Sequence, residues 1–131
     1  MALDKPMLLL VEDEALIAVA LEQELTDAGF HVLLVHDGQE AVSHIDQGVH
    51  HFSGLITDIR LPAVDGWFIA RHARELAPTM PVVYMSGDSA ADWAANGVPN
   101  SIMLSKPFAM AQLTAAIAKL INELPPAISE Q

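Results

Sequence analysis

The chain contains no cysteine, which excludes a disulfide framework and a thiolate metal site. It also lacks a long hydrophobic run, because its longest apolar stretches, residues 7–11 and 15–21, are far shorter than the roughly 20 residues of a membrane-spanning helix. Its first residues do not show the charged and apolar regions of a signal peptide. These absences predict a cytoplasmic protein that makes no contact with a membrane.

Basic residues are scarce: 6 Lys and Arg stand against 17 Asp and Glu, for a net charge of -11. A surface of this sign repels polyanions, so we expect no direct contact with nucleic acid. The 131 residues, of which 52% are hydrophobic, suffice for one domain with one core. We expect this domain over residues 1–124, followed by a frayed tail over residues 125–131 that starts at two consecutive prolines.

Five short apolar runs alternate with segments of helical pattern. The runs predict strands at residues 7–11, 31–36, 54–57, 82–85 and 101–104, and helices at about 15–28, 38–47, 67–77, 89–95 and 109–124. This alternation predicts an α/β fold, a doubly wound five-stranded parallel sheet with right-handed crossovers. The flavodoxin-like strand order 2-1-3-4-5 is the order we expect for a small sheet of this type.

Polar side chains follow the ends of four predicted strands. Glu12 and Asp13 follow the first strand, Asp58 the third, Ser86 the fourth and Lys106 the fifth. In a doubly wound sheet, ligands bind at the carboxyl ends of the strands where the strand order reverses, here between the first and third strands. Each residue alone also fits a helix start or a turn, but together they predict one functional site.

The motifs around these residues resemble those of response-regulator receiver domains. They read Val11-Glu12-Asp13-Glu14, Thr57-Asp58-Ile59-Arg60-Leu61-Pro62 with Asp65-Gly66, Met85-Ser86-Gly87 and Ser105-Lys106-Pro107-Phe108, within a resemblance that covers about residues 7–124. The resemblance implies a single-domain response regulator in a two-component phosphorelay. Asp58 would accept a phosphoryl group from a sensor histidine kinase or a histidine phosphotransfer protein. The chain would then signal to an unknown downstream protein through a changed binding face, and would be no enzyme beyond promoting its own phosphorylation and dephosphorylation.

The resemblance also implies roles for the other site residues. Glu12 and Asp13 correspond to the metal-binding acids, Ser86 to the switch hydroxyl and Lys106 to the site lysine. The backbone carbonyl of Arg60 corresponds to a further metal ligand, and the peptide bond after Lys106 is cis in the family. Three ionised carboxylates and one ammonium leave a local charge of about -2, which a single Mg²⁺ would neutralise, with Mn²⁺ as an alternative ion.

Two features depart from the family pattern. Met103 stands where the family usually carries Tyr or Phe, so the usual aromatic relay is not expected here. Only 20 positions separate Ser86 from Lys106, so we expect a short and irregular helix between them. Trp93 lies in this segment; a large residue there is more often part of the core, and the alternative is an exposed docking aromatic.

Two further pairs of residues leave alternatives open. Arg60 and Asp88 each lie two positions beyond a site residue, and we hypothesise that they pair across the site mouth and slow the attack of water on the acyl phosphate. The alternative is two solvated charges. Leu16 and Val19 flank the predicted buried stripe of the first helix, where they either face a partner or pack at the edge of the core.

Other classes of function fit the sequence less well. A hydrolase with an aspartate nucleophile would need an acid/base carboxylate where Arg60 stands. A flavin or nucleotide binder would need a hydroxyl- or glycine-rich loop where the acids 12–14 stand. An adaptor of the same shape that is never phosphorylated stays open because of Met103, but the complete acidic site argues against it. His50 and His51 are adjacent on an expected extended loop and would point apart, which favours a solvated loop over a histidine metal site.

Overall fold

The computed structural model of the protein describes residues 6–124. Its centre is one parallel sheet of five strands, β1 (Met7–Val11), β2 (His31–Val35), β3 (Gly54–Asp58), β4 (Val82–Ser86) and β5 (Ile102–Ser105). The strands lie in the order β2-β1-β3-β4-β5, which confirms the predicted fold class and strand order. The tail predicted over residues 125–131 lies outside the described residues.

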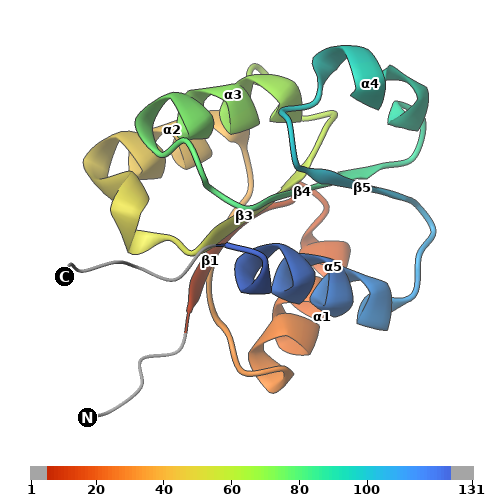
Figure 1. Ribbon diagram of the computed structural model, residues 1–131. Helices are drawn as coiled ribbons and strands as arrows, with labels where there is room; N and C mark the ends of the chain where they lie inside the picture. The colour runs from red at the N-terminus through yellow and green to blue at the C-terminus, as the bar shows by residue number, and fades with distance from the viewer. Residues whose placement is uncertain (1–5, 125–131) are drawn as a thin grey trace, which may run out of the picture.

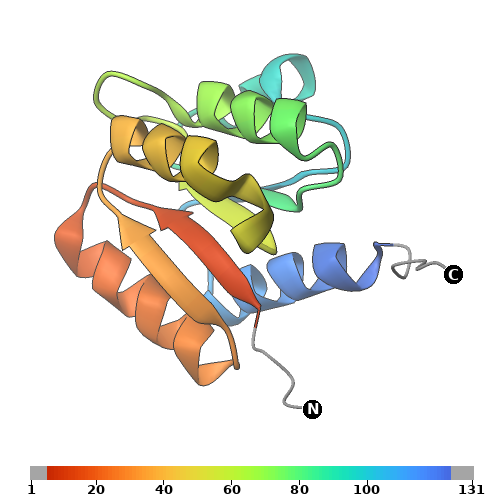
Figure 2. The ribbon, with the colours of Figure 1, turned by 90° about the vertical axis from the view of Figure 1, so that its left-hand side faces the viewer.

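Helices cover both faces of the sheet, as Figures 1 and 2 show. Helices α1 (Ala15–Asp27) and α5 (Met110–Asn122) lie on one face, and α2 (Gly38–Gly48), α3 (Gly66–Leu76) and α4 (Trp93–Asn96) lie on the other. Successive side chains of a strand point to opposite faces, so Leu8 and Leu10 pack under α1 and α5, whereas Leu9 and Val11 pack under α2 and α3. Burial on both faces explains the unbroken apolar runs of the sequence.

The start of α3 fixes the position of the end of β3. Asp65 caps the helix by accepting a hydrogen bond from the backbone N–H of Phe68 at 2.9 Å. A Cβ atom on Gly66 would lie 2.2 Å from the backbone oxygen of Asp58, so only glycine permits this close approach. The helix therefore begins directly against Asp58, one of the predicted site residues.

The connection from β4 to β5 is short and irregular, as predicted. A 3-10 turn at Ala90–Asp92 precedes α4, which has only 4 residues, in place of the single helix expected over residues 89–95. No residue of the stretch 90–97 is buried. Trp93 is 38% exposed, and its indole N–H donates to the Ser101 hydroxyl at 2.9 Å. The interpretation of Trp93 as a core residue is therefore wrong.

The two adjacent histidines are also placed differently from the prediction. His50 and His51 belong to a 3-10 turn, Val49–His51, rather than to an extended loop, and both are exposed. Val49, the first residue of the turn, is buried, so the turn anchors on the core while both histidines face outward. Across residues 6–124, neither histidine belongs to a group that could bind a metal ion. No helix in this part of the chain combines the length and the apolar character that crossing a membrane requires.

Candidate functional site

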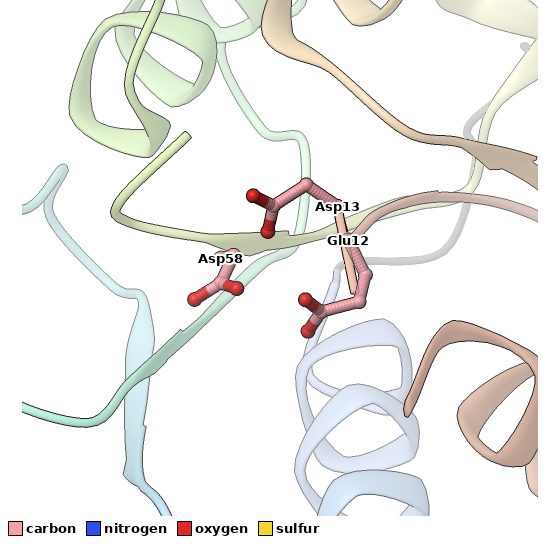
Figure 3. Close-up of side chains that lie close together, drawn as sticks. All are labelled: Glu12, Asp13 and Asp58. Atoms are coloured by element: carbon pink, nitrogen blue, oxygen red, sulfur yellow. The ribbon is translucent and has the colours of Figure 1, made fainter. Parts of the chain in front are cut away.

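Three carboxylates meet at the carboxyl edge of the sheet. Glu12 and Asp13 follow β1, and Asp58 is the last residue of β3, the strand beside β1 at the reversal of the strand order. One oxygen from each carboxylate lies within 4.8 Å of the others, and Figure 3 shows the three groups facing a common space. Glu12 is fully buried and Asp58 almost so, whereas Asp13 is exposed at the rim. The topology thus brings together acids that are far apart in the sequence.

Lys106 reaches this cluster from the end of β5, the edge strand two positions from β3. Its ammonium nitrogen lies 3.0 Å from Oδ2 of Asp58 and 3.3 Å from Oε1 of Glu12. The lysine follows β5, and its backbone N–H donates to the carbonyl of Ser86 at 2.7 Å. The peptide bond between Lys106 and Pro107 is cis, as the resemblance implies. One positive charge therefore bridges two of the three carboxylates.

The electrostatics of the cluster favour a bound cation. Burial raises the pKa of the Glu12 carboxyl to about 7, and the charge of Asp58 adds to the effect, although the Glu14 N–H and Lys106 oppose it. Burial lowers the pKa of Lys106, but its hydrogen bond to Asp58 and the nearby carboxylates outweigh burial, so the pKa is raised. The lysine stays charged and does not neutralise three acids. Clustered carboxylate oxygens are the ligands that hard divalent cations prefer, so these residues fit Mg²⁺.

The Ser86 hydroxyl is held by the loop that follows it. Ser86 ends β4 and is buried, and its Oγ accepts hydrogen bonds from the backbone N–H of Asp88 at 3.2 Å and of Ser89 at 2.6 Å. Ser89 was missed by the sequence interpretation. Its signal was the Ser-x-x-Ser spacing, since serine hydroxyls often accept from the backbone of the following turn.

A pocket of about 490 Å³ opens above these groups. All of the predicted site residues except the buried Glu12 line this pocket. Its complete lining is Asp13, Glu14, Asp58, Arg60, Ser86, Gly87, Asp88 and Lys106. Arg60 and Asp88 form the hypothesised ion pair, with 2.8 Å between Nε and Oδ2, although both side chains are exposed to solvent. Glu14, which was not among the predicted site residues, lines the pocket as well.

A second pocket of about 540 Å³ lies at the opposite edge of the sheet. It is formed by the end of α5 and by the loops that precede β4 and β5, and it is lined by residues such as Arg74, Asn100 and Lys119. It contains none of the three clustered carboxylates. The larger pocket therefore lacks a cluster of carboxylates like that around Asp58. We take the pocket around Asp58 as the candidate site.

Comparison with curated proteins identifies relatives of this chain. It is 31% identical over 116 residues to the response regulator receiver protein CpdR of Brucella abortus (strain 2308), which covers 87% of this chain and 95% of that protein. The chain also matches longer transcriptional regulatory proteins, of which it spans about half the length. The match to CpdR therefore extends over nearly the whole of a receiver protein of similar size.

Solved structures and the family model agree with this result. A response regulator receiver protein from Sinorhizobium medicae WSM419 superposes with a TM-score of 0.89 at 46% identity, covering 93% of this chain and 98% of that one. The receiver domain of the sensor histidine kinase PA1611 from Pseudomonas aeruginosa PAO1, solved with a magnesium ion coordinated in its active site cleft, has a TM-score of 0.79 at 27% identity, covering 92% and 100%. The family model of the response regulator receiver domain matches residues 8–118. The chain therefore belongs to the response regulator receiver domain family.

Proposed function

We propose that this receiver domain accepts a phosphoryl group on Asp58 from a phosphohistidine, in a Mg²⁺-dependent reaction, and signals through a changed protein-binding face. The observation that carries the proposal is the environment of Asp58. Its carboxylate lines an open pocket, its Oδ2 accepts a hydrogen bond from Lys106 at 3.0 Å, and two further acids lie beside it. A carboxylate so placed is a nucleophile with charge compensation at hand.

The transfer follows from the chemistry of these residues. An oxygen of Asp58 attacks the phosphorus, a P–O bond forms, and the P–N bond of the phosphohistidine breaks with its electron pair left on the imidazole nitrogen. Lys106 stays protonated and neutralises charge on the phosphoryl oxygens. The Ser86 hydroxyl, at the edge of the same pocket, donates a hydrogen bond to the acyl phosphate once its loop moves inward.

A metal ion completes the site in this proposal. Glu12, Asp13 and Asp58, together with the backbone carbonyl of Arg60, would hold one Mg²⁺, with Mn²⁺ as an alternative. The bound ion would offset negative charge on the transferring oxygens. The close approach of the carboxylate oxygens and the raised pKa of Glu12 support this assignment, as does the magnesium ion in the PA1611 receiver domain.

The exposed face of α1 offers the phosphoryl donor a place to bind. Leu16 is 88% exposed and Val19 59% exposed, so the alternative of burial at the edge of the core is wrong for both. Both lie close in sequence to Glu14, which lines the pocket, so a donor that brings a phosphohistidine to Asp58 also covers this face. We infer a sensor histidine kinase or a histidine phosphotransfer protein that presents an apolar helix face.

We propose that the protein promotes only its own phosphorylation and dephosphorylation, because Arg60 occupies the position where an aspartate-nucleophile hydrolase needs an acid/base carboxylate. The Arg60 guanidinium is also engaged by Asp88. The acidic surface argues against direct binding of nucleic acid. The cytoplasmic location stays a prediction from the sequence.

Intact mass spectrometry tests the phosphoacceptor directly. Incubation with Mg²⁺ and acetyl phosphate should add the mass of one phosphoryl group to the wild type and to the control Asp27→Asn, which removes an exposed acid at the far end of α1. Asp58→Asn should gain no mass, and Lys106→Met should react roughly 10²-fold more slowly because it loses a charge beside the transferred group. A phosphoryl group on Asp58→Asn, or none on the wild type, would contradict the proposal.

A further inference from the structure

One ion pair joins the two loops that form the mouth of the site pocket. Arg60 lies in the loop after β3 and Asp88 in the loop after β4, and Nε of Arg60 lies 3.0 Å from Oδ1 and 2.8 Å from Oδ2 of Asp88. Both residues line the pocket that contains Asp58. Their side chains are 78% and 54% exposed. A guanidinium group is thus held at the rim of the pocket by a carboxylate that water also reaches.

The same carboxylate belongs to the turn that holds the Ser86 hydroxyl. The Asp88 backbone N–H donates to Oγ of Ser86, and the Ser89 hydroxyl donates to Oδ1 of Asp88 at 3.0 Å. The Ser89 backbone N–H also donates to Oγ of Ser86. Two contacts therefore hold this turn. The Arg60 guanidinium binds the Asp88 side chain at the pocket rim, and the buried Ser86 hydroxyl accepts from the turn's backbone N–H groups.

Phosphorylation changes the balance of charge around Arg60. An exposed ion pair shifts an equilibrium by about fivefold at most. A phosphoryl group on Asp58 brings a charge of roughly -1.5 to -2 and three acceptor oxygens into the pocket that Arg60 lines. Arginine binds phosphoryl oxygens through two parallel charge-assisted hydrogen bonds, which are shorter and stronger than neutral ones. The added negative charge also repels Asp88, so both effects act against the existing pair.

We propose that Arg60 exchanges partners when Asp58 is phosphorylated, leaving Asp88 and binding the phosphoryl oxygens. This inference rests on the proposed function, because it requires a phosphoryl group on Asp58. The exchange makes Arg60 a second cation at the phosphoryl group, beside Lys106, and it removes the contact that holds the turn at the pocket rim. Ser86 then moves inward with its loop without needing an aromatic side chain on β5, where Met103 stands.

The alternative is a lid in which Arg60 and Asp88 stay paired over the acyl phosphate and slow the attack of water. The two arrangements differ in the role of Asp88. In a lid, Asp88 helps to protect the phosphoryl group. In the exchange, Asp88 competes with the phosphoryl group for the guanidinium, so removing its charge strengthens binding of the phosphoryl group.

Beryllium fluoride, which binds carboxylates as a phosphoryl mimic, separates these cases. Its affinity in the presence of Mg²⁺ is measured by fluorine NMR for the wild type, Arg60→Gln, Asp88→Asn and the double variant. We expect Arg60→Gln to lower the affinity by about tenfold or more, and Asp88→Asn to raise it by about fivefold at most. The amide oxygen introduced by Asp88→Asn can still accept from Ser89, so the turn is kept. In the Arg60→Gln background, the second substitution should raise the affinity less than it does in the wild type, because it then relieves only the repulsion between Asp88 and the bound anion.

Several results would overturn the exchange. An affinity that Asp88→Asn lowers or leaves unchanged would contradict it, and a lower affinity would favour the lid. Equal effects of Asp88→Asn with and without Arg60 would also contradict it, because the two residues would then act independently. Failure of the proposed function gives a different result, since the wild type would then bind no more beryllium fluoride than Asp58→Asn. Circular dichroism checks the fold of each variant.

Discussion

Glu12 is a buried acid whose neutralisation should stabilise the protein while it destroys the proposed metal site. Its side chain is fully buried beside Asp58, and burial raises its pKa from the ordinary value of 4.5 to about 7. Without a metal ion, the ionised Glu12 carboxylate therefore destabilises the folded state, although the proposed function requires this charge. Glu12→Gln removes this charge and keeps the shape of the side chain, including an oxygen that can accept from the Glu14 N–H.

The size of the effect follows from the raised pKa. Because the folded state holds the proton more tightly than the unfolded state, Glu12 contributes stability that is complete below pH 4.5 and is lost as the pH rises to about 7. The full loss corresponds to about 3 kcal/mol, and the part lost between about pH 5.5 and pH 8 to about 2 kcal/mol. Glu12→Gln cannot titrate. Its free energy of unfolding relative to the wild type should therefore rise by about 2 kcal/mol over this interval.

Urea unfolding at the two pH values, with a chelator present, measures this difference. The comparison across pH cancels any fixed cost of the substitution, such as a weakened contact with Lys106. Asp13→Asn is the matched control, because it removes a charge from the same cluster at an exposed position. We expect the control to follow the wild type across the pH interval. Added Mg²⁺ at about 100 times its dissociation constant should stabilise the wild type by about 2.7 kcal/mol and Glu12→Gln by less.

A constant difference in the free energy of unfolding between Glu12→Gln and the wild type would contradict a cost of the buried charge. If Glu12→Gln and the wild type lose the same stability between the two pH values, the buried carboxyl does not carry the inferred cost. A variant that becomes relatively less stable at high pH would show the opposite sign, with Glu12 stabilised in its charged form by Lys106. A normal response of Glu12→Gln to Mg²⁺ would remove Glu12 from the set of metal ligands.

Three further predictions concern the metal, the backbone and the loop before β5. The affinity for Mg²⁺, measured by calorimetry, should fall by up to about tenfold for each pH unit below about 7, because Glu12 must lose its proton when the ion binds. Gly66→Ala should cost about 1–3 kcal/mol in thermal unfolding and disturb Asp58, because the added methyl group meets backbone atoms. Gly87→Ala is the control, because its added methyl group has no atom within 4 Å, and it should leave the stability unchanged. Tyr84→Phe should cost about 1–3 kcal/mol, because a buried backbone N–H loses its acceptor.

The sheet could be predicted from the sequence because its strands are buried on both faces. All five strands have bounds within two residues of the prediction, since an unbroken apolar run ends where the chain leaves the sheet. The strand order then placed the ends of β1 and β3 side by side, which made Asp58 and the acids after β1 neighbours. Topology therefore predicted the convergence of the acids, although they are remote in sequence.

The departures lie where local pattern is weak. Trp93 sits outside the core because its ring is held by a hydrogen bond to Ser101, a tertiary contact that no local pattern reveals. Leu16 and Val19 are exposed because periodicity gives the direction of a buried stripe on a helix but not its width. The depth of burial of Glu12, and hence its raised pKa, depends on tertiary packing around the cluster. None of these follows from residue type and spacing.

The distribution of positive charge supports the proposed role of a metal ion in the transfer. Within residues 6–124, Arg71 and Arg74 donate to backbone carbonyls of the loops before β4 and β5, and Lys119 pairs with Glu123, so these cations serve the fold. Lys106 and Arg60 are the cations that line the pocket. Lys106 is shared by two carboxylates and Arg60 is bound to Asp88. In a protein of net charge -11, this pocket thus offers an incoming phosphoryl group no unshared cation within the described residues, and in the proposed function a divalent ion would supply the missing positive charge.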